Sequence, residues 1–189
     1  MVIAMRDTLI TSERLVLMAP RRADFEDWSS IRTASRSHLE PWEPRWPTDA
    51  NSKADWTRRL RAWTVAWKEG RAYVFLIRRV SDNALVGGAS LTHVRAWPAS
   101  SASLGYWLGA DFEGQGYMRE AVSTLCGWAF GRLGLWRIEA GTLAENDRSR
   151  QVLESVGFTE EGYARAYLEI AGERRDHVLF GLVRPQNHG

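Results

Sequence analysis

The residues best suited to chemistry lie at positions 103–119, where a predicted strand is followed by a loop with two glycines and the first turn of a predicted helix. The first turn of a helix has unpaired backbone N–H groups and the positive end of the helix dipole. Gly114 and Gly116 have no Cβ, so an anion can approach the main chain closely there. The sequence therefore predicts a phosphate-binding turn.

Three other groups of side chains are candidates for a reaction. Glu139 lies at the inner end of a predicted strand, where it is either a general base, acting directly or through water, or a paired or solvated carboxylate. Asn146 is suited to cap the helix predicted over 147–156, and Ser149 is either a second capping contact or a hydrogen-bond donor to a bound ligand. Trp42 lies between two glutamates in a proline-rich segment.

Hydrophobic periodicity predicts the elements that must hold these residues. Apolar runs predict seven strands, at 14–18, 73–77, 84–91, 103–108, 136–142, 163–170 and 177–183. Apolar positions at helical spacing predict about four helices, one capped by Asp24, one carrying Trp56 to Trp67, one from 116 to about 133 and one over 147–156. Three prolines within seven residues predict a stiff extended loop at 38–47.

Length and composition limit the class of protein. With 189 residues, 44% of them hydrophobic and 25% charged, the chain is expected to form a single globular domain over 1–189. The net charge of +2 gives no argument for nucleic-acid binding. The single cysteine, Cys126, excludes an internal disulfide and is expected to pack in the core. No signal peptide, membrane-spanning run or metal-ligand spacing is found, so a cytoplasmic protein without a metal site is expected.

A dinucleotide-binding fold is one alternative explanation of the glycine turn. Gly114 and Gly116 follow a strand, and Glu139 ends the next strand about twenty residues later, which is part of a nicotinamide-binding signature. The third small position of that signature is occupied by Arg119, whose bulk would hinder close packing of the helix on the strand. The hairpins predicted before and after the turn also argue against a parallel sheet.

The order of several motifs resembles the GNAT acetyltransferase superfamily. A strand, a Gly-x-Gly turn, a helix and a further strand lead to Asn146 and Ser149, and Gly157-Phe158 closes the series. The chain is most similar to the RimJ/RimL type of ribosomal-protein N-terminal acetyltransferase, and within it to the RimJ branch. The segments that carry this resemblance span nearly the whole chain and are Thr11-Ser12-Glu13-Arg14-Leu15, His38-Leu39-Glu40-Pro41-Trp42, Gly105-Tyr106-Trp107-Leu108, Gly114-Gln115-Gly116-Tyr117-Met118 and Arg174-Arg175-Asp176-His177-Val178-Leu179.

The resemblance implies an α/β fold of the α+β kind, with a central, mixed, mostly antiparallel sheet of seven strands flanked by about four helices. The fourth and fifth strands would splay apart and hold acetyl-CoA, the implied cofactor. The family motif usually has Gln or Arg where this chain has Asp111, but the site is expected to survive because backbone N–H groups supply most of the grip. The implied cofactor-binding residues are Leu108, Gly109, Gly114, Gln115, Gly116, Tyr117, Met118, Arg119, Asn146 and Ser149.

The implied reaction is transfer of an acetyl group to a primary amine. Ser149 would hydrogen-bond the coenzyme A sulfur, a backbone N–H near Leu108 would polarise the thioester carbonyl, and Glu139 is the candidate base. Ser103 stands where related strands often carry an acid, which leaves the general base open. The candidates for the acceptor side, or else for a rigid structural lid, are Glu40, Trp42 and Glu43.

An N-terminal α-amine makes the smallest demand on such a base. Its pKa of about 7.7–8.0, against about 10.4 for lysine, leaves roughly a tenth of it neutral at pH 7 and lowers the demand by roughly 3 kcal/mol. The expected partner is therefore a protein N-terminus, such as that of a ribosomal protein. The alternatives are a small-molecule amine or a module that binds coenzyme A without catalysis, in a monomer or a homodimer. His177 is expected to be a strand residue rather than a catalyst.

Overall fold

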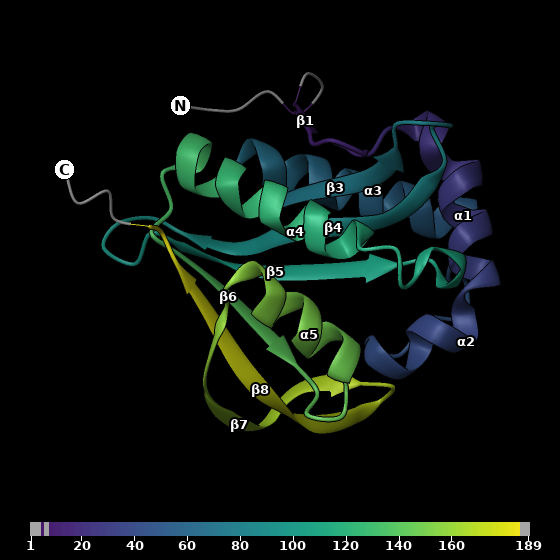
Figure 1. Cartoon of the computed structure of the whole chain (residues 1–189). Coiled ribbons are helices and arrows are strands. Elements are labelled where there is room, and N and C mark those ends of the chain that lie inside the picture. Colours follow the sequence, from purple (N-terminus) through teal and green to yellow (C-terminus); the bar gives the residue numbers. More distant parts are fainter. Residues whose placement is uncertain (1–4, 6–7, 186–189) are drawn as a thin grey trace.

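A computed structural model describes Met5 and residues 8–185; residues 1–4, 6–7 and 186–189, at the ends of the predicted domain, lie outside the described residues. One twisted sheet of eight strands runs through the molecule in the order β1-β2-β3-β4-β5-β6-β8-β7 (Figure 1). The strands are β1 Leu9–Thr11, β2 Leu15–Met18, β3 Tyr73–Arg79, β4 Leu85–Arg95, β5 Ser101–Leu108, β6 Arg137–Thr142, β7 Thr159–Ile170 and β8 Glu173–Val183. The helices are α1 Phe25–Ala34, α2 Arg36–Leu39, α3 Lys53–Lys68, α4 Tyr117–Trp128 and α5 Asp147–Val156.

The sheet is mixed and mostly antiparallel, which confirms the predicted fold class. The parallel pair within the described residues joins β5 to β6, the predicted fourth and fifth strands. This pair is only three residues long, from Ser101 opposite Arg137 to Ser103 opposite Glu139. Beyond that point the two strands diverge, and Figure 1 shows α5 in front of the angle between them. The splayed strands that the family resemblance implies are therefore present.

The sheet has one strand more than predicted. Strand β1 pairs antiparallel with β2, and Ser12 donates a backbone hydrogen bond to Leu15 at 2.9 Å in the turn between them. Three residues are too few to show a periodic pattern, so the prediction of seven strands was wrong by this edge strand.

The proline-rich segment is partly helical, so the prediction of an extended loop was wrong over its first half. The chain forms α2 and continues in a 3₁₀ turn over Glu40–Trp42. Pro41 lies in the first turn of that 3₁₀ helix, where its missing N–H has no intrahelical partner to lose. The backbone becomes extended at Glu43, ahead of the next two prolines. Helix α2 also raises the number of α-helices from about four to five.

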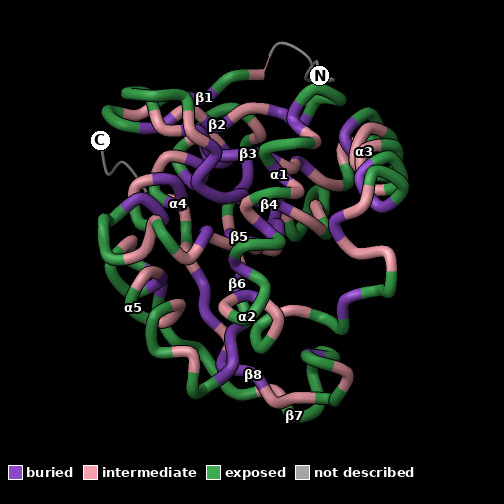
Figure 2. The backbone as a smooth tube through the Cα atoms, turned by 90° about the vertical axis from the view of Figure 1, so that its right-hand side faces the viewer, coloured by how far each residue is buried: buried purple, intermediate pink, exposed green. Residues whose placement is uncertain are grey.

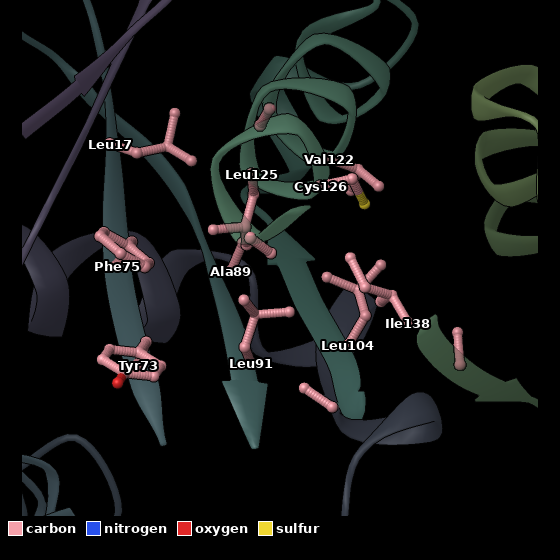
Figure 3. Packing of buried hydrophobic residues seen from close by; sticks show 14 of the residues in the cluster. Leu17, Tyr73, Phe75, Ala89, Leu91, Leu104, Val122, Leu125, Cys126 and Ile138 are labelled. Carbon is pink, nitrogen blue, oxygen red and sulfur yellow. The ribbon is translucent and has the colours of Figure 1, made fainter. Parts of the chain in front are cut away.

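The main core lies between the sheet and α4. Phe75, Leu91 and Leu104 of neighbouring strands pack toward α4, which contributes Val122, Leu125 and Cys126 (Figure 3). Cys126 is buried there, which confirms its predicted place in the core. Burial raises the pKa of its thiol to about 12, so the thiol stays protonated at neutral pH. We call this side of the sheet the α4 face.

Helices α1 and α3 cover the opposite side, which we call the α1/α3 face. Trp28 of α1 and Trp56 of α3 pack with Leu76 and Leu85 in a second buried cluster, and Trp107 of β5 lies at its border. The two tryptophan rings of the helices are 4.9 Å apart between centroids. Figure 2 shows the buried stretches running along the central strands, between these two helical layers.

Candidate functional site

A cavity of about 1010 Å³ opens where β5 and β6 diverge. Its wall is built from these two strands, from α5, from the β7–β8 hairpin and from part of the proline-rich segment. The wall residues that matter most for chemistry are Trp42, Tyr106, Glu139, Asn146, Ser149, Tyr167 and His177. The cavity therefore brings together residues that lie more than a hundred positions apart in the sequence.

Strand alternation decides which side of the sheet each wall residue occupies. The two neighbours of Glu139 on β6 lie in the core beneath α4, and so do Val178 and Phe180 of β8. Because successive side chains of a strand point to opposite faces, Glu139 and His177 point to the α1/α3 face. Tyr106, in contrast, packs against the core beneath α4 and reaches α5. The cavity thus connects the two faces of the sheet.

Ser149 is positioned by two contacts at the start of α5. Asn146 Oδ1 accepts a hydrogen bond from the backbone N–H of Ser149 at 3.1 Å, which confirms that Asn146 caps the helix. The Tyr106 hydroxyl lies 2.8 Å from Ser149 Oγ and donates to the Ser149 carbonyl oxygen at 3.1 Å. Burial raises the pKa of Tyr106 to about 12, so both hydroxyls keep their protons at neutral pH.

The glycine turn before α4 has the backbone that an anion site needs. Gly116 caps the helix with a φ of 76°, a left-handed conformation that favours glycine. No side chain caps the N-terminus of α4, so its first N–H groups have no side-chain partner. Gly114 is exposed, with a φ of 70°, and a Cβ added there would meet nothing within 4 Å. An anion can therefore approach this main chain from solvent.

Arg14, in the turn between β1 and β2, holds the glycine turn in place through hydrogen bonds. Its Nη1 donates to the carbonyl oxygen of Gln115 at 3.0 Å. Its backbone N and its Nε donate to the carboxylate of Glu120 at 2.8 and 2.7 Å, and the Ser12 hydroxyl donates to the same carboxylate at 2.7 Å. The C=O and N–H of a trans peptide point in opposite directions, so fixing the Gln115 carbonyl also fixes the direction of the Gly116 N–H.

Glu139 lies in the cavity wall and is engaged by two arginines. Its Oε2 accepts a hydrogen bond from Arg95 Nη2 at 2.5 Å, and its Oε1 accepts one from Arg137 Nε at 3.0 Å. Arg137 also pairs with Glu161 of β7. Both oxygens of Glu139 already accept hydrogen bonds from cations, which favours the paired-carboxylate alternative. The role of Glu139 as a base stays a prediction.

The proline-rich segment supplies Trp42 and Glu43 to the cavity wall. Glu43 accepts two hydrogen bonds from the guanidinium of Arg32, at 3.1 and 2.5 Å, and one from Trp46 Nε1 at 2.8 Å. Its carbonyl oxygen accepts a hydrogen bond at 2.9 Å from Ala171, in the turn between β7 and β8. The segment is therefore fastened both to α1 and to the hairpin, as a rigid lid would be.

Glu40, in contrast, does not reach the cavity. It forms an ion pair with Arg36 on the exposed side of α2, at 3.1 Å. The hydrogen bonds from Arg36 lower the pKa of Glu40, so this carboxylate is charged at neutral pH. The three predicted acceptor-side residues are thus divided between the cavity wall and the outer surface.

The predicted cofactor residues are also divided. Those in the cavity wall are Leu108, Met118, Asn146 and Ser149. Those exposed on or next to the glycine turn are Gly114, Gln115, Gly116 and Arg119. Tyr117 is buried beneath the guanidinium of Arg14, which lies 4.9 Å from its ring centroid. Gly109 is packed against Ile31 and donates its N–H to Val86 at 2.9 Å, so the structure does not bring it to the cavity.

Sequence reasoning missed Tyr106, Arg14 and Glu120 as parts of the site. The alternation of β5 was a signal for Tyr106, because it lies two residues from Leu104 and Leu108 and so shares their face. No local signal marks Arg14 as the partner of the glycine turn. Asp111, the departure from the family motif, accepts a hydrogen bond at its carbonyl oxygen from the Gln115 side chain at 3.2 Å, which a residue of any type could do.

Two kinds of feature are absent from the residues that the structure describes. No group of three or more His, Cys, Asp or Glu side chains there is arranged to hold a metal ion. Over the same residues, no helix combines the length and the apolar character that crossing a bilayer requires.

Comparison with known proteins relates this geometry to a family. The acetyltransferase (GNAT) domain matches residues 14–159. A [ribosomal protein uS5]-alanine N-acetyltransferase of Escherichia coli is 31% identical over 176 residues, which are 93% of this chain and 91% of the relative. The solved structure of Mycobacterium smegmatis RimJ in complex with CoA-disulfide is 34% identical, has a TM-score of 0.86, and is matched over 91% of this chain and 84% of that chain.

A second solved structure gives the same result. The ribosomal-protein-S5-alanine acetyltransferase from Vibrio fischeri is 28% identical with a TM-score of 0.86, and the match covers 95% of this chain and all of that chain, 100%. The family match, the relatives and the splayed strands agree with the resemblance seen in the motifs. The chain belongs to the GNAT acetyltransferase family.

Proposed function

We propose that the protein transfers an acetyl group from acetyl-CoA to the N-terminal α-amine of a protein, with a ribosomal protein as the preferred acceptor. The observation that carries this proposal is the single cavity between β5 and β6, which has the Ser149 and Tyr106 hydroxyls at one face of the sheet and Trp42 and Tyr167 toward the other. An acyl donor and an amine can meet there from opposite faces. Relatives named as ribosomal-protein acetyltransferases support the choice of acceptor.

Acetyl-CoA fits the residues that are present. The backbone N–H groups from Gly116 to Arg119 would hold its diphosphate, because the turn is exposed and no side chain caps α4. Leu108 and Asn146 would flank its pantetheine arm in the gap. The cavity of about 1010 Å³ is large enough for a ligand of this kind, since small-molecule sites enclose about 300–1,000 Å³. When bound, acetyl-CoA supplies an acetyl group activated as a thioester.

The hydroxyl pair of Ser149 and Tyr106 would donate the proton that the leaving sulfur needs. Both hydroxyls are protonated at neutral pH, and Asn146 holds the backbone of Ser149 in place. A backbone N–H of β5 near Leu108, on the edge that β6 leaves unpaired, would polarise the acetyl carbonyl. These donors lie on a strand and at a capped helix end, so they are held in position before a substrate enters.

An α-amine suits the opposite wall better than a lysine does. The carboxylates of Glu43 and Glu139 are both held by arginines, so neither is free to take a proton from a strongly basic amine. About a tenth or more of an α-amine is neutral at pH 7, against well under a thousandth of a lysine side chain. The engaged carboxylates therefore favour an acceptor that needs little help to lose its proton.

Thiol release and intact mass together test the proposal. The protein would be incubated with labelled acetyl-CoA and three acceptors: peptides with a free N-terminal alanine, the same peptides with a blocked N-terminus and an internal lysine, and a polyamine. We expect one acetyl group on the free N-terminal peptide and none on the blocked one. Ser149→Ala serves as the matched control, because it removes the hydroxyl and leaves the Tyr106 contact with the backbone of residue 149.

The other outcomes separate the alternatives. Acetylation of the polyamine alone would show that the acceptor is a small-molecule amine. Binding of acetyl-CoA without transfer to any acceptor, including an extract of ribosomal proteins, would show a module that binds coenzyme A without catalysis. Either result would contradict the proposed acceptor while leaving the family assignment intact.

A further inference from the structure

His177 is a buried imidazole in the cavity wall, and the proposed function assigns it no role. It lies on β8, is 2% exposed, and points to the α1/α3 face, where the acceptor would enter. Its Cδ2, the ring atom next to Nε2, faces Gly141 of β6, since a Cβ built on that glycine would make an ordinary van der Waals contact with it at 3.7 Å. The edge of the ring that carries Nε2 is therefore turned from β8 toward β6 and the gap.

The hydrogen bonding of the ring fixes which nitrogen can accept a proton. His177 Nδ1 lies 3.0 Å from the backbone carbonyl oxygen of Arg175. A carbonyl oxygen only accepts, so Nδ1 must carry the hydrogen, and in the neutral ring Nε2 then has a free lone pair. The Tyr167 ring lies against the imidazole, with the two ring centroids 5.5 Å apart. This ring contact does not change which nitrogen carries the hydrogen.

The Nε2 atom is open to the cavity. It has no hydrogen-bond partner within the described part of the chain. In that part of the chain, the side-chain polar atoms that are fully enclosed and have no partner are Trp56 Nε1 and Arg150 Nε. His177 Nε2 is not among them, so it is not fully enclosed. A buried ring with an unpartnered, accessible lone pair is arranged to accept a hydrogen bond or a proton from a molecule in the cavity.

The carboxylates of the wall are less available than this nitrogen. Glu43 is held by Arg32, Glu113 by Arg148, and Glu139 and Glu161 by Arg137. Glu169 is the wall carboxylate without an ion pair among the described residues, and it lies exposed next to the hairpin turn. The charged or titratable side chains that share the cavity wall with His177 are His38, Glu43, His93, Tyr106, Glu113, Arg137, Glu139, Arg148, Glu161, Tyr167, Glu169 and Arg174.

We propose that His177 is a catalytic residue whose Nε2 takes the proton from the ammonium group of the acceptor. This inference rests on the proposed function. The neutral amine then forms the new C–N bond while the C–S bond breaks and its electron pair leaves on sulfur. The nitrogen then loses its second proton to solvent, and the hydroxyl pair, which has given a proton to the sulfur, regains one from solvent. One proton is released in total, and His177 accepts it and passes it to solvent.

The pH dependence of kcat/KM distinguishes a catalytic role of His177 from a purely structural one, because the acceptor amine itself changes its protonation over this pH range. Without a base, only the neutral fraction of the amine can react, which is about a tenth at pH 7 and nearly all at pH 9 for a pKa of about 7.7–8.0. His177→Gln should therefore lower kcat/KM for a peptide with N-terminal alanine about tenfold at pH 7 and less than twofold at pH 9. Gln can still donate to the Arg175 carbonyl, so the fold should be kept, and the acetyl-CoA Kd from calorimetry should not change.

Two further variants sharpen the result. His93→Gln tests the exposed histidine of β4 that also lies in the cavity wall and contacts the Thr92 hydroxyl, and it should leave the pH profile unchanged. Glu169→Gln tests the rival carboxylate. Equal losses at pH 7 and pH 9 for His177→Gln, no loss at either pH, or the pH-dependent loss in Glu169→Gln or His93→Gln instead would each overturn the proposal.

A measurement on the wild-type protein needs neither an active acceptor nor a folded variant. Long-range ¹H–¹⁵N NMR spectra of the histidine rings report which nitrogen carries the proton. We expect neutral His177 to be protonated at Nδ1, whereas a neutral ring protonated at Nε2 would overturn the proposal. If the wild-type protein acetylates no peptide, the proposed function fails in the same kinetic assay, and the tautomer of His177 is still decided.

Discussion

Replacing Arg14 by glutamine should weaken acetyl-CoA binding without touching the residues proposed to react. Arg14 fixes the carbonyl of Gln115 and, through the peptide plane, the N–H of Gly116. It also holds Glu120, in the first turn of α4, by its backbone and its side chain. Glutamine keeps much of the length of the side chain but loses the charge and the fork that joins the two partners.

The size of the effect follows from exposure. A hydrogen bond from a charged donor contributes about 1.5–3 kcal/mol when it is buried. The Arg14 side chain is 46% exposed, so solvent screens its pair with Glu120, and we expect about 1 kcal/mol or less from that pair. Misdirecting one backbone donor to a phosphate adds a loss of similar size. The acetyl-CoA Kd should therefore rise about five- to thirtyfold, since about 1.4 kcal/mol corresponds to a factor of ten.

An acetyl donor that lacks the diphosphate shows whether Arg14→Gln acts through the glycine turn. S-acetyl-pantetheine has the thioester and the arm but no diphosphate, so kcat/KM with this donor should be the same for Arg14→Gln and the wild type. Calorimetry with acetyl-CoA and thiol release with both donors provide the two measurements. Equal losses with both donors would mean that Arg14 only supports the fold. An unchanged acetyl-CoA Kd would refute the argument from the peptide plane.

Three further predictions concern the hydroxyl pair, Glu139 and Glu120. Ser149→Ala should lower kcat about 100-fold and leave the acetyl-CoA Kd within about twofold by calorimetry, whereas equal losses would show that the serine serves binding alone. Adding Tyr106→Phe should cost little more if the two hydroxyls act as a unit. Because two arginines hold Glu139, Glu139→Gln should not change the low-pH limb of the rate profile, and a depressed limb would restore Glu139 as the base. Burial raises the pKa of Glu120, but hydrogen bonds from Arg14 and Ser12 outweigh burial and lower it below 4.5. Its contribution to stability is then complete above pH 4.5 and lost as the pH falls through the folded value, so acid unfolding should be less steep in Glu120→Gln.

Local patterns in the sequence were enough to predict the helix ends and turns that are set by their own residues. Asn146 and Gly157 bound α5 at the predicted residues, because one caps its N-terminus and the other adopts the left-handed conformation at its end. The glycines at 114 and 116 likewise have the positive φ angles that such a turn requires. Features that depend on neighbours in the sequence could therefore be predicted from the sequence.

Pairings between distant residues could not be predicted in this way. Arg95 and Glu139 are 44 positions apart, Tyr106 and Ser149 are 43 apart, and Arg14 and Glu120 are 106 apart. Each pair depends on which strands become neighbours and on how far those strands diverge. A local sequence period encodes neither of these two properties. The role of Glu139 stayed open from the sequence for this reason, and no sequence pattern indicated that the Nε2 of His177 faces the cavity.

The short ladder between β5 and β6 gives the protein two interior sheet edges. Past Ser103 and Glu139, every second amide on each strand faces the gap without a partner strand, although β4 and β8 pair with the other sides. Such amides should exchange their hydrogens for deuterium much faster than those of Ala102 and Ile138, within the ladder. A ligand that fills the gap would slow this exchange, so the protein carries a label-free reporter of occupancy in its own backbone.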